Sequence, residues 1–391
     1  MRRLIAGVAV VAMLAGCSPA ANRTPDPTTP VDPALAVPTL LQGLAQALNA
    51  QDTSALSQLA DPAVPQAGAE LADLLANVRS LGLSGISLRY LGSRPSADPA
   101  RLEVSVDLRW RRAGEPGLLA AQVPMVLTLG EGGAWFLTAR VTGTHSLPLW
   151  LLGRVDVARS PGVVVDSLDP AATGRYLDYA VQARSDVRRY LPPPAGDLVI
   201  EVPRSAAEFT ALLASTSPEA KALAAVTETS FGAEHGSILV NPGLMDRLSG
   251  LAAQIVVTHE AVHVALDAPG SGTPMWLQEG YADYVAFATH PASVRVVAAD
   301  LLTQVARSGP PGHLPGPDAF AGSTQTEGVA YESAWLACRW IANHYGADRL
   351  LALYRAADRA DSDARPLRRI LGITRARLTQ QWRASRSRLA G

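Results

Sequence analysis

The sequence predicts an α+β protein, in which N-terminal helices and a curved antiparallel sheet precede a mostly helical domain with a small edge sheet. Leucines recur at helical spacing between residues 38 and 81, which favours helices at the start of the folded part. The segment Arg101–Arg111 then alternates apolar and polar residues, as a strand with one buried face does. Beyond about residue 250, most segments carry the helical period instead. Helices and strands in separate runs are typical of the α+β class.

The length and composition of the chain are those of a globular protein with two domains. It has 391 residues, of which 48% are hydrophobic and 18% are charged, and its formal net charge is -1. This charge gives no whole-chain argument for a nucleic-acid partner, so none is expected. We expect four segments. They are a signal peptide with a lipobox over 1–17, a disordered tether over 18–37, an α+β domain over 38–145 and a second domain over 146–391.

The first 17 residues have the pattern of a bacterial lipoprotein signal. The chain begins Met-Arg-Arg, and the apolar run Leu4–Leu14 is too short to span a bilayer as a permanent helix. The run is followed by Ala-Gly-Cys17, which resembles the lipobox, where cleavage leaves a lipidated cysteine at the new N-terminus. The alternative is an ordinary secretory signal in which Cys17 is incidental. We expect lipidation of Cys17 and a location in the cell envelope, outside the cytoplasm and anchored to the membrane.

The segment 38–145 is expected to form a domain without a catalytic site. Its helices are followed by four strand-like segments, and Glu131-Gly132-Gly133 has the composition of a hairpin turn. In the order of its elements the segment resembles the NTF2-like cone fold. No His/Asp constellation occurs in it, so we expect a non-catalytic binding, spacing or pro-domain-like module. The predicted strands cover 86–91, 101–111, 122–129 and 135–141.

Strands and helices are both expected at the start of the second domain. Ser205 and Glu208 have the spacing of a capping box, which favours a helix from about residue 206. A long helix is predicted to end at three consecutive prolines after residue 191. The predicted elements are strands over 163–166, 198–202, 226–229 and 237–240, and helices over 171–191 and 205–213.

The second domain contains the motif H-E-x-x-H at residues 259–263. On a helix, residues four apart lie on one face, so His259 and His263 can direct imidazole nitrogens at one point. Zinc takes such nitrogens at about 2.0–2.1 Å in a tetrahedral arrangement, with one position open in catalytic sites. Glu260 is expected to be the general base rather than a ligand. The helix is apolar, and buried polar groups need partners, which favours a metal over two solvated histidines.

A second segment, Trp276–Tyr284, offers the carboxylates that such a site still lacks. Pro274 suits the first turn of a new helix, and Glu279 lies within an apolar run. Asp283 follows four residues later and is expected on the same face as Glu279. There it can accept the free ring N–H of a zinc-binding histidine, and the sequence leaves open which histidine that is.

The two motifs together resemble those of the gluzincin metallopeptidases, in particular the compact bacterial domains called peptidase MA-like. The resemblance implies that His259, His263 and Glu279 bind Zn2+, that Glu260 is the base and that Asp283 orients a ligand. It also implies a sheet edge that binds an extended peptide, which we expect at Ser237–Asn241. In the family a tyrosine or histidine of the helix that closes the cleft stabilises the oxyanion, and Tyr331 is the candidate here. His235 and His313 are weaker rivals.

Two hypotheses about function follow. The first is a zinc-dependent peptidase of the bacterial cell envelope that hydrolyses peptide bonds of a peptide or protein substrate. The second is a non-catalytic zinc-binding envelope lipoprotein that acts as a binding or scaffold module. A serine hydrolase has no support, because the motif G-x-S-x-G does not occur. Substrate preference and oligomeric state remain open.

Overall fold

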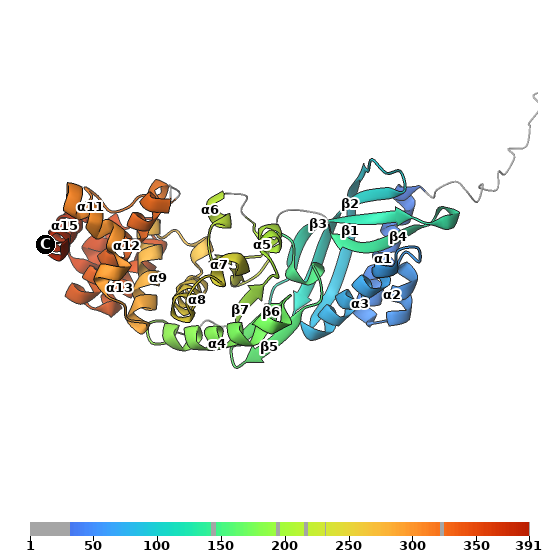
Figure 1. Cartoon of the computed structure of the whole chain (residues 1–391), viewed down its shortest axis with the longest axis horizontal. Coiled ribbons are helices and arrows are strands. Elements are labelled where there is room, and N and C mark those ends of the chain that lie inside the picture. Colours follow the sequence, from blue (N-terminus) through green and yellow to red (C-terminus); the bar gives the residue numbers. More distant parts are fainter. Residues whose placement is uncertain are drawn as a thin grey trace, which may run out of the picture.

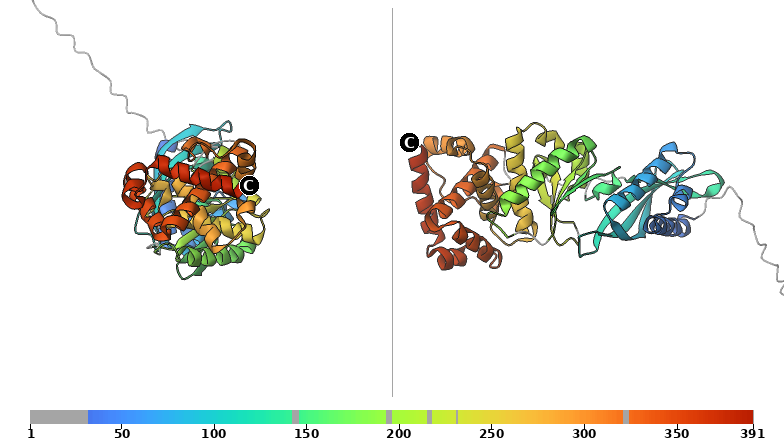
Figure 2. Two further views of the ribbon diagram at one scale, coloured as in Figure 1. Left: turned by 90° about the vertical axis from the view of Figure 1, so that its left-hand side faces the viewer. Right: turned by 90° about the horizontal axis from the view of Figure 1, so that it is seen from below.

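The chain folds as an elongated molecule in which helices and two sheets follow one another along the long axis (Figure 1). The computed structural model describes residues 32–141, 146–192, 196–214, 218–230, 232–320 and 324–390. The first helices and the first sheet lie at one end, the second sheet lies in the middle, and the C-terminal helices lie at the other end (Figure 2). The predicted α+β class is confirmed. The predicted signal, Cys17 and most of the tether lie outside the described residues.

The N-terminal domain begins earlier than predicted. Helix α1 starts at Pro33, inside the segment that we expected to be a disordered tether. The reason is a good helix start, because the Asp32 side chain accepts a hydrogen bond from the Ala34 N–H at 2.9 Å and proline suits the first helical position. Pro38, which we took as the domain boundary, therefore lies inside this helix. The helices of this domain are α1 (Pro33–Ala50), α2 (Thr53–Leu59) and α3 (Pro65–Ser80).

In the described part of the chain the first sheet has four antiparallel strands in sequential order. The alternation predicted for β2 is confirmed, because its even-numbered residues from Leu102 to Trp110 are buried and most odd-numbered ones are not. Register shifts in β1 mark irregularities of the kind that bend a strand. The resemblance to an NTF2-like cone remains a prediction. The strands are β1 (Leu83–Pro95), β2 (Arg101–Arg112), β3 (Leu119–Leu129) and β4 (Trp135–Val141).

The second sheet is mixed, and its described strands lie in the order β5-β6-β7-β9-β8. The edge strand near the helices is therefore β8, and the expectation that Ser237–Asn241 forms the edge is wrong. The cause is that the chain turns back after residue 228, so that β9 inserts between β7 and β8. Strand β5 was not among the predicted strands. The strands are β5 (Asp156–Ser160), β6 (Val163–Ser167), β7 (Leu198–Val202), β8 (Ala225–Glu228) and β9 (Ser237–Val240).

The two faces of the second sheet belong to different cores. On β9, Ile238 and Val240 pack in the core that contains helices α4 and α8, whereas Leu239 packs in the core of the N-terminal domain. The connection between β2 and β3 also touches the loop between β8 and β9. A Cβ on Gly117 would lie 2.2 Å from the Gly232 carbonyl oxygen, so side chains are excluded at this contact. The boundary predicted near residue 145 therefore separates two domains that share a core.

Helices form the remainder of the second domain. Of the described helices, none has both the length and the apolar character needed to cross a membrane. The chain after Pro291 forms two helices, α10 and α11, which are divided at Ala298. The helices are α4 (Pro170–Val187), α5 (Ala206–Leu212), α6 (Pro218–Lys221), α7 (Pro242–Met245), α8 (Gly250–Ala265), α9 (Met275–Thr289), α10 (Val294–Val297), α11 (Ala299–Ser308), α12 (Thr324–Tyr345), α13 (Ala347–Asp358), α14 (Ala364–Pro366) and α15 (Arg375–Ala390).

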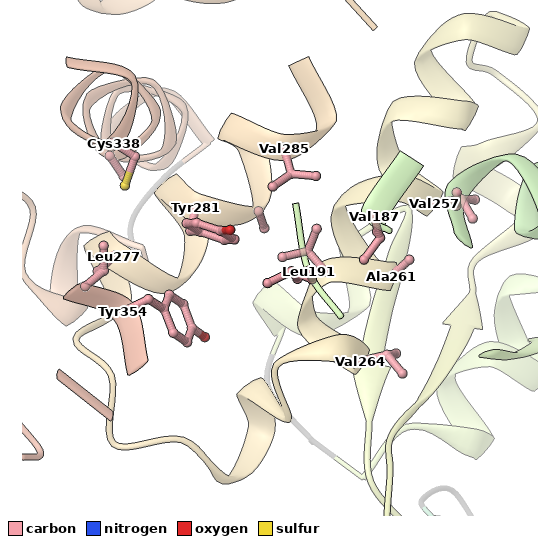
Figure 3. Packing of buried hydrophobic residues seen from close by; sticks show 14 of the residues in the cluster. Val187, Leu191, Val257, Ala261, Val264, Leu277, Tyr281, Val285, Cys338 and Tyr354 are labelled. Atoms are coloured by element: carbon pink, nitrogen blue, oxygen red, sulfur yellow. The ribbon is translucent and has the colours of Figure 1, made fainter. Parts of the chain in front are cut away.

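Helix α9 is held between α8 and α12 by close packing. Val187, the last residue of α4, and Leu191, which follows the helix, lie between the apolar faces of α8 and α9 (Figure 3). On its other side α9 approaches the backbone of α12, because Gly280 has no side chain. A Cβ at this position would lie 2.4 Å from the Ala334 carbonyl oxygen and 2.9 Å from the Cys338 sulfur.

We expect the substitution Gly280→Ala to lower the free energy of unfolding by about 1–3 kcal/mol, because the new methyl group overpacks this contact. Urea denaturation measures the change. Gly174→Ala in α4 is the matched control, since its Cβ would meet nothing within 4 Å. That control should raise the stability by about 0.5–1 kcal/mol. Equal effects of the two substitutions would contradict the close approach of α9 and α12.

A polar layer lies between the second sheet and the N-terminal domain. Arg112 at the end of β2 forms an ion pair with the buried Asp166 of β6 at 2.6 Å. Glu201 of β7 accepts a hydrogen bond from the Ser237 hydroxyl at 3.2 Å. Burial, together with the negative charge of Asp166, raises the pKa of Glu201 to about 7. The folded protein therefore holds this proton at a pH where an unfolded glutamate has lost it.

This shift predicts a pH-dependent stability that Glu201→Gln removes. A glutamate of the unfolded chain titrates near about 4.3. Since the folded-state value is higher, the free energy of unfolding of the wild type should fall by about 2–3 kcal/mol between pH 5 and pH 8 because of Glu201. Urea denaturation of the metal-free protein at both pH values tests this. Glu103→Gln, on the exposed side of β2, should keep the wild-type dependence; an unchanged pH slope in Glu201→Gln would exclude the shift.

Candidate metal centre

Helix α8 brings the H-E-x-x-H residues together as the sequence predicts. The helix begins after Ser249, whose hydroxyl accepts a hydrogen bond from the Ala252 N–H at 3.2 Å. Apolar residues on several sides of the helix are buried, so α8 packs between the second sheet and α9. His259 and His263 follow one another on the side that faces α9, with ring centroids 4.7 Å apart.

The ligand atoms of His259, His263 and Glu279 converge on one point. The two Nε2 atoms lie 3.0 Å apart, and Glu279 Oε2 lies 3.2 Å from Nε2 of His259 and 3.4 Å from Nε2 of His263. Three ligands at about 2.05 Å from a tetrahedral ion are separated by about 3.3 Å. The three residues can therefore hold a metal ion without a change of backbone.

The third ligand reaches this point because α9 folds back beside α8. The chain turns at Asp267, which adopts a left-handed conformation with φ 51°, and passes through a short 3-10 turn. Pro274 directly precedes the first residue of α9 rather than lying within the helix. Gln278 secures the start of α9, because its amide donates to the Thr273 carbonyl oxygen at 2.9 Å. One turn into the helix, Glu279 faces the two histidines.

Asp283 is the hydrogen-bond partner of His259. The sequence did not determine which of the two histidines Asp283 contacts. Its Oδ1 lies 2.8 Å from Nδ1 of His259, so the ring donates a hydrogen bond there. With Nδ1 engaged by Asp283, Nε2 is the ring nitrogen of His259 that faces the ligand point. The four-residue spacing of Glu279 and Asp283 thus places a ligand and its supporting carboxylate on one face of α9.

The charges of the site favour a cation. Burial alone would lower the pKa of His259, but the carboxylates of Asp283 and Glu279 outweigh it and raise that pKa well above its usual value. Burial likewise opposes ionisation of Glu279, but His263 and His259 hold the pKa of this carboxyl far below its usual range. An ionised carboxylate beside two ring nitrogens in a buried setting is suited to a divalent ion.

The ligand point opens into a cleft of about 450 Å³. One wall consists of residues 223–227, which include most of the edge strand β8, and the other consists of α8, α9 and Tyr331. Glu260 lines the cleft beside the ligands. Its carboxylate accepts a hydrogen bond from the Thr227 hydroxyl at 2.7 Å. Sequence reasoning missed Thr227, because a threonine in a short strand carries no signal that distinguishes it from ordinary strand composition.

Tyr331 lies in this cleft, whereas its two rivals do not. It comes from α12, and its ring packs edge-on against Phe320 with centroids 5.2 Å apart. Burial, and then the charges of Glu279 and Asp283, raise the pKa of Tyr331 far above its usual value, so its hydroxyl keeps its proton. His313 contacts the Leu314 carbonyl oxygen through Nδ1 at 3.0 Å, and His235 lines a separate cavity of about 570 Å³ between the domains.

The N-terminal domain leaves the cleft open. None of its described residues lines the cleft, and its contacts with the second domain lie on the opposite face of the second sheet. The loop between α11 and α12 also contributes none of its described residues to the cleft wall. Access to the ligand point is therefore determined by β8, α8, α9 and α12.

We expect the chain to bind one divalent cation, and Asp283→Asn to weaken that binding by about 10- to 100-fold, because His259 loses the acceptor that orients it. Titration calorimetry with Zn2+, supported by elemental analysis, measures both affinity and stoichiometry. Asp178→Asn, on the exposed face of α4, is the control and should bind as the wild type does. Wild-type affinity in Asp283→Asn would show that the 2.8 Å contact does not support the ligand.

No protein-family model matches the sequence, and no curated protein matches it either. The assignment of a candidate metal centre therefore depends on the side chains themselves. His259, His263 and Glu279 form a group that can hold a metal ion, with Asp283 and Glu260 beside it.

Proposed function

We propose that the protein is a zinc-dependent peptidase. The observation that carries the proposal is the convergence of three ligand atoms within 3.0–3.4 Å of one another beside a glutamate that is not a ligand. Two imidazoles and one carboxylate are the ligand set of catalytic zinc, which keeps a fourth position open. A purely structural zinc site is closed by four protein ligands and has no need of an adjacent base.

The roles of the residues follow from their positions. His259, His263 and Glu279 would hold the ion, and when bound it would supply a Lewis acid and lower the pKa of a water molecule. Glu260 accepts the proton that this water loses and passes it to the amine that leaves. Tyr331 keeps its proton and donates a hydrogen bond where negative charge develops on the carbonyl oxygen. Asp283 keeps His259 in the required orientation.

A peptide is the substrate class that the cleft wall supports. Strand β8 is the edge of its sheet and borders the cleft, and none of the described strands pairs with its outer side. An extended peptide can add to such an edge by main-chain hydrogen bonds, which hold the chain independently of its side chains. Val226 and Thr227 belong to the part of β8 that lies in the cleft.

We further propose that the protein acts in the cell envelope, anchored through Cys17. The support is the signal-like start of the sequence and the lipobox pattern. The described chain begins in the domain that lies farthest from the C-terminal helices (Figure 2). Anchoring at that end would place the N-terminal domain nearer to the membrane than the second domain, which contains the cleft.

The substitution Glu260→Gln tests the mechanism. We expect kcat/KM for a cleaved peptide to fall by about 10²- to 10⁴-fold, because the amide cannot accept the proton. Cleavage of a fluorescence-quenched peptide library, with and without chelator, first identifies a substrate of the wild type. The zinc content and the thermal midpoint of the variant should be unchanged.

Glu234→Gln, at an exposed glutamate before β9, is the matched control and should retain wild-type activity. Wild-type turnover in Glu260→Gln would remove Glu260 as the base. A zinc-loaded wild type that cleaves no peptide would instead favour the non-catalytic zinc-binding lipoprotein.

A further inference from the structure

The general base of the proposed reaction is held by a residue outside the two zinc-binding helices. The Thr227 hydroxyl lies 2.7 Å from Glu260 Oε2 and 3.1 Å from the backbone carbonyl oxygen of the same residue. Glu260 is 8% exposed, and no other hydrogen bond to its carboxylate occurs within the described ranges. Within the described ranges, one hydroxyl on β8 is therefore the hydrogen-bond partner of a carboxylate on α8.

We infer that Thr227 is a positioning residue for Glu260, an inference that rests on the proposed peptidase function. A glutamate side chain has three rotatable bonds, and ordering it costs conformational entropy. A hydroxyl that donates to the carboxylate selects one of its conformations. The 2.7 Å distance is that of a well-formed O–H···O hydrogen bond. The residue held in this way lines the same cleft as His259, His263 and Glu279.

The fold fixes the Thr227 hydroxyl in turn. Thr227 pairs with Ile238 in the antiparallel ladder between β8 and β9, and this pairing holds its backbone conformation. Its methyl group points to Gly236, where a Cβ would lie only 2.9 Å from that methyl carbon. A β-branched side chain has few allowed rotamers, and with the methyl group placed against Gly236 the hydroxyl faces α8. Serine at position 227 would keep the hydroxyl but lose this second contact.

A purely structural role of Thr227 would lead to a different result. If Thr227 only joined β8 to α8, its loss would reduce stability and would not act on turnover in particular. Valine at position 227 has nearly the same shape, suits a strand and lacks only the donor. The comparison of Thr227→Val with Thr227→Ser therefore separates the effect of the hydrogen bond from the effect of the packing.

The experiment compares the zinc-loaded wild type with Thr227→Val, Thr227→Ser and Thr229→Val. We expect Thr227→Val to lower kcat by about 10- to 100-fold, because the base is no longer held in place, with KM within about twofold. Thr227→Ser should stay within about threefold of the wild type. Thr229→Val, two residues further along and lining the other cavity, should match the wild type. Zinc content should be the same in all four proteins.

Two further measurements separate positioning from other roles. In a Glu260→Gln background, Thr227→Val should cause no additional loss of turnover, because the group that it positions is already removed. Crystal structures of the zinc-loaded proteins should show a single Glu260 conformation in the wild type and in Thr227→Ser. In Thr227→Val the carboxylate should be displaced or should occupy several conformations.

The outcomes distinguish this inference from the proposed function. A wild type that hydrolyses no peptide would defeat the proposed function, and the crystal structures alone would then decide the role of Thr227. The inference is overturned if Glu260 keeps its wild-type conformation in Thr227→Val. It is also overturned if Thr227→Val retains wild-type kcat while Glu260→Gln does not, or if the two losses are independent.

Discussion

The candidate metal centre depends on the distance at which α9 lies from α8. Two of the candidate ligands come from α8 and one comes from α9. The distance from each ligand atom to a bound ion must lie within about 0.2 Å of its usual value. The ligands do not determine that distance. It is determined by apolar packing, with Val187 and Leu191 between the two helices and Gly280 allowing contact with α12 on the far side (Figure 3). Close-packed interiors transmit displacements, so the core is part of the site.

Local spacing allowed much of this site to be predicted. The separations His259 to His263 and Glu279 to Asp283 are each one helical turn, and helix geometry alone places each pair on one face. The partner of Asp283 depends on how two helices rotate against each other, which no local pattern contains. Thr227 was missed for the same reason, because its role requires β8 to lie beside α8.

In the fold, too, the elements set by local sequence patterns were predicted, and those set by tertiary contacts were not. The alternation in β2 and the helices of the second domain follow from periodicity, and both are found. The position of β9 inside the sheet depends on which strands pair, so an edge was expected at Ser237–Asn241 in place of β8. The start of α1 at Pro33 was hidden by a composition rich in proline, which we interpreted as a tether although proline also suits a helix start.

The shared core has a consequence for how this chain can be divided. Leu239 and Phe209 of the second domain pack with the N-terminal domain, and Asp166 has Arg112 as its ion-pair partner. A fragment starting near residue 146 would present those apolar side chains to water and leave a carboxylate without its cation. Such a truncated protein would tend to aggregate. The second domain cannot therefore be transplanted as an independent module unless its exposed face is redesigned.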